Sequence, residues 1–291
     1  MEQLDDWLKA GKIAGEAREY AKSIAKKGVL LKDLAEQIEQ KIKDLGGQPA
    51  FPVNLSMDAF AAHDTPAPDD TRVLESQVLK IDIGVHVEGC IGDTAATVDL
   101  SGNHAKLVEA SEKALAAAIE KVKADASLGE IGAAINDTVA SFGFRPIRNL
   151  SGHGLEPFIV HAPPSIPNFD TKDSTKLERP MVIAIEPFAT DGAGMIEDKG
   201  DPVIFSQVNT GSLRTQTSRL VLAHITDYAM MPFATRWLPF SKGQVALALR
   251  DLRLHNLLHP YPPLVDRANG MVSQAEHTLI LTEDEVIVST R

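Results

Sequence analysis

Within residues 78–86, every second residue from Leu79 to Val85 is apolar, and this pattern constrains the fold more than any other part of the chain. Such alternation predicts a strand with one buried face. Glu88-Gly89 follows as a turn, and a second strand is expected near residues 91–99. The sequence therefore predicts an antiparallel hairpin whose apolar face carries Leu79, Ile81, Ile83 and Val85.

Helices and further strands are expected along the rest of the chain. Apolar residues at helical spacing predict helices over residues 5–28, 32–45 and 104–124. Ser127 and Glu130 form a capping box that opens another helix. Residues 48–72 are proline-rich and irregular, a kind of segment that is often functional. Strands are expected near residues 145–150, 157–161, 181–187, 271–281 and 285–289, the last two as a hairpin with Glu283-Asp284-Glu285 at or near its turn.

Residues 192–258 differ in character from their surroundings. Two helical patterns, near residues 214–228 and 243–257, predict an α-helical insertion within one α+β domain spanning residues 1–291. Its apolar positions must bury a face, and the main sheet is the simplest place for it. The alternative is a helix-turn-helix DNA reader, against which the lack of a basic face argues.

The charge balance and the cysteine count narrow the class of protein. A formal net charge of −11 argues against a general nucleic-acid binder, which needs clustered Lys and Arg. Cys90 is the single cysteine, so an intrachain disulfide is excluded and a reducing compartment, the cytoplasm, is expected. The acidic N-terminus lacks the apolar region of a signal peptide. The longest apolar stretch, around Met181–Ile185, is too short to span a membrane.

Two aspartates lie on the polar face of the predicted hairpin. With a two-residue turn, facing positions sum to an odd number, so Asp82 and Asp93 share one face as direct or diagonal neighbours, about 5–8 Å apart at Cβ. Like charges held this way are destabilising and favour a cation between them. The alternative interpretation is two solvent-facing acids on an exposed sheet.

Three further residues strengthen the case for a cation. Glu186 ends the almost wholly apolar run from Pro180 to Pro187, and Glu276 precedes another apolar strand. A buried carboxylate must be paired, metal-bound or protonated, although a strand-end carboxylate that reaches solvent is an alternative for each. His153 lies between two glycines in a predicted loop, and imidazole is the commonest metal ligand.

The ordered set of these motifs resembles the methionine aminopeptidases. The family's five metal positions match Asp82, Asp93, His153, Glu186 and Glu276. The motifs around them are Lys80-Ile-Asp82-Ile-Gly84, Gly89-Cys-Ile-Gly-Asp93-Thr-Ala-Ala-Thr97, Gly152-His153-Gly154, Ile185-Glu186-Pro187 and Glu276-His277-Thr278. The insertion before Tyr261-Pro-Pro-Leu264 and the segment from Phe51 to His63 are similar to the type II subfamily, and the short N-terminus is similar to its archaeal members. Asp64, where many relatives carry an aromatic residue, is expected to flank the pocket.

This resemblance implies a fold and a metal centre. The family has the pita-bread α+β fold, a curved antiparallel sheet flanked by helices. The resemblance implies two divalent ions per chain, of Co, Mn, Fe or Zn, with a hydroxide bridging them as the nucleophile. Asp82 and Asp93 would hold one ion, Asp93 and Glu276 would bridge to the second, and His153 and Glu186 would complete the shell of that second ion.

The resemblance also implies an activity and the residues that perform it. The family removes the initiator methionine from nascent proteins when the second residue is small. Glu186 is the candidate general base, and His63 and His161 are expected to contact the substrate amide and the transition state. Phe51, Val160 and Tyr261 match positions that line the methionine pocket.

Two other functions stay open at this level. One is a pita-bread peptidase for X-Pro or dipeptide substrates, which shares the five ligands. The other is a non-catalytic pita-bread module that binds protein or RNA. The expected partner is the N-terminus of a nascent polypeptide, with a transient ribosome contact left open. We expect a monomer with neither a specific nucleic-acid ligand nor a membrane attachment.

Overall fold

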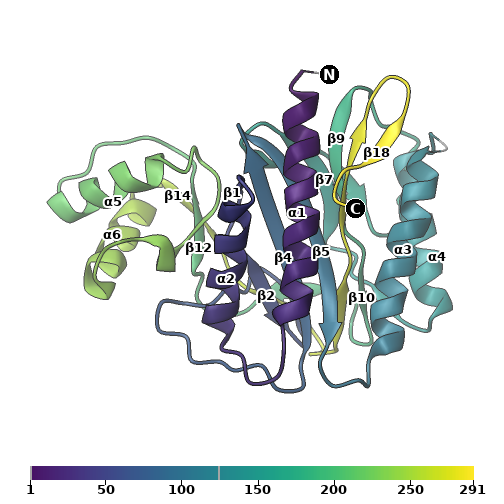
Figure 1. The fold of residues 1–291 in the computed structure, drawn as a ribbon, viewed down its shortest axis with the longest axis horizontal. Helices are drawn as coiled ribbons and strands as arrows, with labels where there is room; N and C mark the ends of the chain where they lie inside the picture. Colours follow the sequence, from purple (N-terminus) through teal and green to yellow (C-terminus); the bar gives the residue numbers. More distant parts are fainter. Residues whose placement is uncertain (1, 124) are drawn as a thin grey trace.

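A computed structural model describes residues 2–123 and 125–291 of the chain. Its body is built from two helix pairs that pack on antiparallel sheets, and a smaller lobe projects from one side (Figure 1). The α+β class predicted from the sequence is confirmed. Within these described ranges, no helix is both long enough and apolar enough to cross a membrane.

The first half of the body pairs two helices with the predicted hairpin. Helices α1 (Leu4–Ile24) and α2 (Leu31–Asp44) lie over a sheet of β1 (Gln48–Pro49), β2 (Asn54–Met57), β4 (Val78–Val87) and β5 (Cys90–Asp99). Leu79, Ile81, Ile83 and Val85 are fully buried in one core with both helices. The alternation at residues 78–86 therefore assigned the faces of β4 correctly, with the apolar face toward the helices.

Helix α1 approaches the sheet closely because its inner face is made of small residues. Ala10, Ala14, Ala17 and Ala21 are fully buried. A Cβ atom on Gly92 of β5 would lie 2.6 Å from the carbonyl carbon of Ala10, so only glycine fits there. The helix ends at Ile24, four residues earlier than expected from the sequence, and Gly28 adopts a φ of +90° in the following turn.

The second half repeats this plan with different elements. Helices α3 (Ala105–Lys123) and α4 (Leu128–Ser141) share a core with a sheet ordered β18-β17-β9-β7-β8. Ser127 and Glu130 form the predicted capping box. The predicted end of the first helix of this pair, residue 124, lies outside the described residues. The strands are β7 (Ser151–Glu156), β8 (Ile159–Pro167), β9 (Met181–Ile185), β17 (His277–Leu281) and β18 (Val286–Val288).

Short three-stranded sheets complete the body. One is ordered β16-β10-β6, from Val272–Gln274, Phe188–Thr190 and Arg145–Pro146. The other is ordered β11-β15-β3, from Ile196–Asp198, Leu264–Asp266 and Phe60–Ala62. Strands predicted near 145–150 and 271–281 are thus shorter or broken in the structure. The break between β16 and β17 falls at Ala275-Glu276, which releases Glu276 from the strand pairing.

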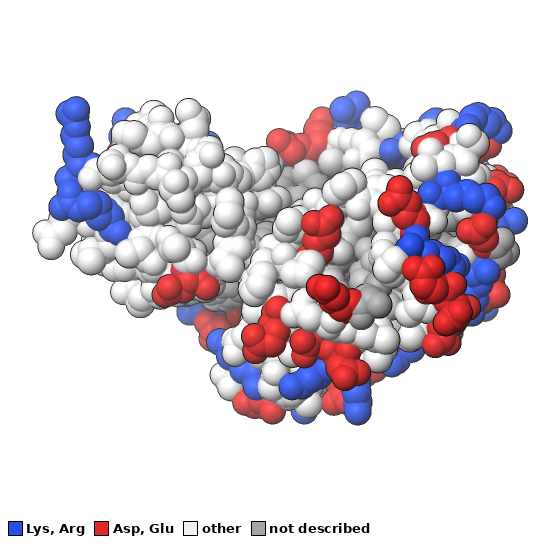
Figure 2. Space-filling view, turned by 90° about the horizontal axis from the view of Figure 1, so that it is seen from above, with Lys and Arg blue, Asp and Glu red and all other residues white. Residues whose placement is uncertain are grey.

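The lobe is formed by the segment predicted as a helical insertion. Helices α5 (Gln216–Thr226) and α6 (Lys242–Leu254) accompany a small sheet ordered β13-β12-β14, from Phe233–Ala234, Ile204–Gln207 and Leu258–Tyr261, and the 3-10 helix η1 (Thr235–Trp237). Figure 2 shows that the lobe is mostly uncharged on one face, with Lys and Arg at its outer end, whereas acidic residues are spread over the body.

The expectation that this segment buries its apolar face against the main sheet is wrong. Val221 and Leu249 instead pack into a core of the lobe's own, together with Phe205 and Phe233. Leu220 and Leu247, on the opposite sides of the same helices, are each 52% exposed. The three short strands supply the apolar surface that the helices need, so the lobe buries most of its apolar face internally.

Candidate metal centre and substrate pocket

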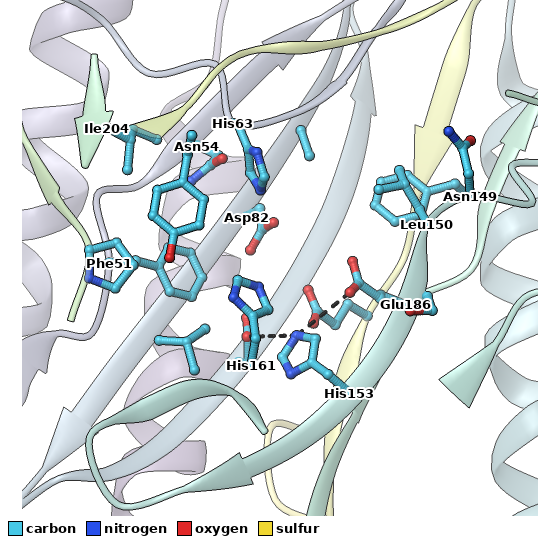
Figure 3. Close-up of a pocket in the computed structure, with 18 of the residues that line it drawn as sticks. Phe51, Asn54, His63, Asp82, Asn149, Leu150, His153, His161, Glu186 and Ile204 are labelled. Carbon is cyan, nitrogen blue, oxygen red and sulfur yellow. Dashed lines mark ion pairs between the residues drawn. The ribbon is translucent and has the colours of Figure 1, made fainter. Parts of the chain in front are cut away.

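One cavity of about 350 Å³ is lined by all ten residues singled out from the sequence, which are Phe51, His63, Asp82, Asp93, His153, Val160, His161, Glu186, Tyr261 and Glu276. They come from both halves of the body and from the lobe. Figure 3 shows Phe51 and Ile204 on one side, Asn149 and Leu150 on the other, and the acids and histidines between them. The cavity therefore has an apolar end and a charged centre.

The hairpin register places the two aspartates as diagonal neighbours. Asp82 faces Ala95, and Asp93 faces Gly84, two residues further along β4 on the same face. Gly84 leaves room for the ring of Phe51, because a Cβ atom there would lie 2.1 Å from it. The sheet thus presents two carboxylates beside an aromatic ring.

His153 lies on strand β7 and not in the loop expected from the sequence. The glycines on either side allow this, because β7 is pressed between two strands: a Cβ on Gly152 would lie 2.3 Å from the carbonyl oxygen of Ala184, and one on Gly154 would lie 2.0 Å from that of Pro163. Small residues that looked like a loop signal are required here for close strand packing.

The imidazole of His153 presents a lone pair to two carboxylates. Its Nδ1–H donates to the carbonyl oxygen of Gly154 at 3.1 Å, which leaves Nε2 unprotonated in the neutral ring. Burial, and then the neighbouring His161, lower the pKa of His153 to about 3, so the ring is neutral. Nε2 lies 3.6 Å from Glu186 and 3.8 Å from Asp93 (Figure 3). Electron-rich atoms that face one another in this way indicate a cation site.

The two glutamates enter the site at strand ends. Glu186 directly follows β9, and Glu276 lies in the break before β17, where its backbone N–H donates to the carbonyl oxygen of Ala95 at 3.0 Å. Asp93, His153 and Glu276 each offer one ligand atom within 4.8 Å of one another. These three buried residues form a group with the spacing of a metal site.

Hydrogen bonding and charge show that the carboxylates fit divalent cations. Among the described residues, Asp82 Oδ1, Asp93 Oδ1 and Glu276 Oε2 are buried without a hydrogen-bond partner. Burial raises the pKa of Asp82 to about 7. Burial, and then the neighbouring carboxylates, raise the pKa values of Asp93, Glu186 and Glu276 well above their usual range. Four acids that repel one another in a buried site are stabilised together by a bound cation.

Gln274 is a site residue that the sequence did not reveal. Its side-chain Nε2 donates to Asp82 at 3.3 Å and approaches Glu186 at 3.5 Å, so one amide joins carboxylates from the two halves of the body. Gln274 lies at the end of β16 and is 1% exposed. The only indication in the sequence was that Gln274 lies two residues before Glu276, so that both side chains could reach the same site.

Histidines and one tyrosine form an aromatic cluster that lines the cavity. The ring of His153 is 4.7 Å from that of His161, and the ring of Tyr261 is 5.4 Å from His63 and 6.4 Å from His161. His63 adopts a left-handed backbone with φ of +61°, which is uncommon for a non-glycine residue and typical of a constrained site. Burial lowers the pKa of His63 to about 4, so this ring is also neutral.

Asp64 does not flank the cavity, contrary to the expectation from the sequence. Its side chain accepts hydrogen bonds from Arg72 at 2.6 and 3.0 Å, and Arg72 also binds Asp70. Asp64 is absent from the cavity lining. The acid therefore braces the segment that carries His63, a role that depends on a partner eight residues away.

Further lining residues come from segments without a sequence signal. Ile204 and His259 belong to strands of the lobe, and Asn149 and Leu150 precede β7. The ring of His259 lies 4.8 Å from that of Tyr261. Cys90, in contrast, is buried in an apolar cluster as expected, and burial raises the pKa of its thiol to about 11.

Comparison with known proteins agrees with this site. The profile of metallopeptidase family M24 matches residues 6–222. A methionine aminopeptidase of Pyrococcus abyssi is 46% identical over 292 residues, covering 99% of each chain. Among solved structures, a thermophilic Arx1 superposes with a TM-score of 0.85 at 14% identity, covering 98% of this chain and 90% of that one. A methionine aminopeptidase of Thermotoga maritima superposes with a TM-score of 0.72 at 20% identity, covering 100% and 98%.

The solved structures are similar at low sequence identity, so they establish the pita-bread fold alone. The family profile and the 46% identical relative of nearly equal length establish family membership. The two findings together distinguish this chain from proteins that share only its architecture. The chain belongs to metallopeptidase family M24 and, within it, to the methionine aminopeptidases.

Proposed function

We propose that this protein removes the N-terminal methionine from nascent polypeptides whose second residue is small. The observation that carries the proposal is the convergence of four carboxylates and a neutral imidazole in a cavity of about 350 Å³ that has an apolar end. Charge at the centre suits hydrolysis, and the apolar end suits an uncharged, unbranched side chain.

Two divalent ions are proposed for the charged centre. Asp82 and Asp93 would hold one ion, Asp93 and Glu276 would be shared with the second, and His153 and Glu186 would complete the shell of that second ion. Four carboxylates balance the charge of two divalent ions. When bound, such a pair lowers the pKa of water and polarises the scissile carbonyl.

The chain's own side chains bind and orient the substrate. Phe51, Val160 and Tyr261 would surround the methionine side chain, and His63 and His161 would hydrogen-bond the substrate amide. Glu186 would take a proton from the attacking water and return it to the leaving amine. Its oxygen lies 3.6 Å from His153 Nε2, in the charged centre of the cavity.

Peptide hydrolysis with a range of second residues tests this function. Met-Ala-Ser and Met-Gly-Ser should release methionine, and Met-Lys-Ser and Met-Leu-Ser should be poor substrates, because a bulky second residue would crowd the closed centre. Release measured across Mn, Co, Fe and Zn would also identify the metals that support turnover. Equal rates for both peptide sets, or a requirement for proline at the second position, would instead favour the X-Pro peptidase alternative.

We further propose a cytoplasmic setting and a monomer. Nascent chains are met in the cytoplasm, and the single buried cysteine, Cys90, suits a reducing compartment. A transient contact with the ribosome would bring the site close to emerging N-termini. Sedimentation of the purified chain, with and without ribosomes, distinguishes these states directly.

A further inference from the structure

A second hollow, of about 640 Å³, is lined by Arg148, the residue directly before Asn149 and Leu150 of the active-site cavity. Arg145, Arg148 and Phe169 line it. The guanidinium carbon of Arg148 lies 4.2 Å from the centre of the Phe169 ring, a cation–π contact that leaves the N–H edge free to bind another group. Arg145 donates one N–H to the carbonyl oxygen of Gly192 at 2.9 Å.

Neither arginine of this hollow has a carboxylate partner. Within the described residues, no Asp or Glu oxygen lies within 4.0 Å of either guanidinium. Acids close in the chain to the lining residues have other partners: Asp137 bonds Asn136, Asp170 pairs with Lys172, and Asp191 accepts from the backbone N–H of Met271. The two arginines therefore keep their charge available to an anionic ligand.

The walls of the hollow are fixed before any ligand binds. The buried carboxylate of Asp266 accepts hydrogen bonds from the backbone N–H groups of Ala193 and Gly194 at 2.9 and 3.0 Å. The backbone N–H of Arg148 donates to the carbonyl oxygen of Gly194, and the Asn149 side chain bonds both backbone groups of Ile196. The two arginines therefore stand on a rigid frame, which limits the entropy lost on binding.

Arg148 directly precedes Asn149 and Leu150, which line the side of the active-site cavity opposite the proposed methionine pocket. The apolar wall of Phe51 and Ile204 is opposite Asn149 and Leu150 (Figure 3). If methionine occupies the apolar wall, the chain after the scissile bond runs past Leu150. Arg148 is two residues from Leu150, at most about 7.6 Å between Cα atoms. An extended substrate advances about 3.3 Å per residue, so its third to fifth residues come within reach.

We propose that Arg145 and Arg148 form a subsite for an acidic side chain at the third to fifth position of the substrate. This inference rests on the proposed aminopeptidase function. It predicts a preference opposite to that of the whole molecule, because a net charge of −11 attracts basic peptides and repels acidic ones. A preference for acidic peptides would therefore be due to the two arginines and not to the net charge of the molecule.

The test compares Met-Ala-Ser-Glu-Glu, Met-Ala-Ser-Gln-Gln and Met-Ala-Ser-Lys-Lys, all with amidated C-termini so that no terminal carboxylate contributes. In 0.1 M salt, the KM of the unmodified enzyme for the Glu peptide should be about three- to tenfold below that for the Gln peptide. In R145Q/R148Q the KM for the Glu peptide should rise to that of the Gln peptide, with kcat retained. Salt at 0.5 M should weaken the preference.

The matched control is R250Q/R253Q, which removes the same charge from exposed positions of α6 in the lobe. It should keep the preference for the Glu peptide. Equal KM values for the Glu and Gln peptides in the unmodified enzyme, or a preference that survives R145Q/R148Q, would overturn the subsite. Failure of the proposed function would look different, since none of the three peptides would then release methionine.

Discussion

At the scale of single residues, burial shifts the pKa values of the histidines and of the acids of the site in opposite directions. Burial keeps the rings of His63 and His153 neutral, which preserves their lone pairs for binding. Burial also raises the pKa values of the carboxylates, which makes each of them costly to ionise without a cation. The lowered pKa values of the histidines and the raised pKa values of the acids therefore both favour binding of a metal ion.

Glu186→Gln tests the role of general base. The amide keeps the size of the side chain and one oxygen for a ligand, but it cannot accept a proton from water. We expect kcat for Met-Ala-Ser to fall at least about a hundredfold. Metal content measured by mass spectrometry should change less than turnover. Ordinary turnover in this variant at saturating metal would remove Glu186 from the role.

Tyr261→Ala tests the wall of the methionine pocket. The Tyr261 ring packs near His63 and His259, and its hydroxyl lies 3.2 Å from Ser206 Oγ. Removing the ring should raise KM for Met-Ala-Ser about tenfold or more, because the apolar contact with the substrate is lost. Tyr261→Phe is the control and should keep KM within about threefold. If Tyr261→Ala mainly unfolds the protein while the folded fraction binds normally, Tyr261 is plain core.

At the scale of elements, one buried ion pair joins the lobe to the rest of the site. Arg236, in η1 of the lobe, pairs with Glu39 of α2, and their side chains are only 2% and 7% exposed. Trp237 Nε1 donates to the same carboxylate at 2.9 Å. Arg236 also donates to Thr65 Oγ1 at 2.8 Å, and the Thr65 hydroxyl donates to the carbonyl oxygen of Val53 at 2.8 Å. The lobe thereby holds the segment that carries Phe51 and His63.

Arg236→Gln should weaken both the fold and the site. It leaves Glu39 buried without its cation, which costs about 3–5 kcal/mol of unfolding free energy. Because the Val53–Thr65 segment loses a support, kcat/KM should also fall at temperatures where the variant remains folded. Urea denaturation and steady-state kinetics measure the two effects.

The double variant Glu39→Gln with Arg236→Met is the matched control for this pair. It removes both charges, so unfolding free energy should recover in part relative to Arg236→Gln. A single variant as stable as the unmodified chain would show that the pair does not hold the lobe.

At the scale of the whole molecule, metal binding and folding should be linked through protons. Above pH 6.5 the carboxyls of the unfolded chain are ionised, whereas the folded, metal-free chain retains protons on groups such as Asp82, whose pKa is raised to about 7. The folded state then binds more protons, so its stability falls as pH rises. Lys80 has the opposite effect on stability, because burial lowers its pKa to about 7 and the folded chain then loses a proton that the unfolded chain keeps. The four carboxyls outweigh this single amine.

This linkage predicts the thermal stability of metal-free and metal-loaded protein. Between pH 6.5 and 8.5, Tm of the EDTA-treated protein should fall, because the raised pKa values of Asp93, Glu186 and Glu276 keep protons on the folded chain. The Tm gained on adding Mn should grow over the same range, because metal replaces the protons. Asp93→Ala should show a much smaller gain. A metal-induced gain that shrinks toward pH 8.5 would contradict the linkage.

The sequence by itself determined the features that repeat over neighbouring residues. Alternation at 78–86 specified the two faces of β4, and the odd-sum rule placed Asp82 and Asp93 on one face, because side-chain direction follows from strand geometry alone. Helical spacing located α1 to α4, with ends that shifted by up to four residues at α1. The ordered motifs also predicted ten residues that line one cavity, although their roles remain to be tested.

Only the tertiary structure decided which distant segments meet. The glycines beside His153 indicated a loop, but the structure shows a strand packed between β8 and β9. The backbone atoms that exclude a side chain there belong to Pro163 and Ala184, nine or more residues away. Asp64 turns to Arg72, Gln274 joins Asp82 to Glu186, and the lobe buries Val221 on its own sheet. Local periodicity carries no record of such partners, because pairing between remote segments is set by the summed packing of the whole chain.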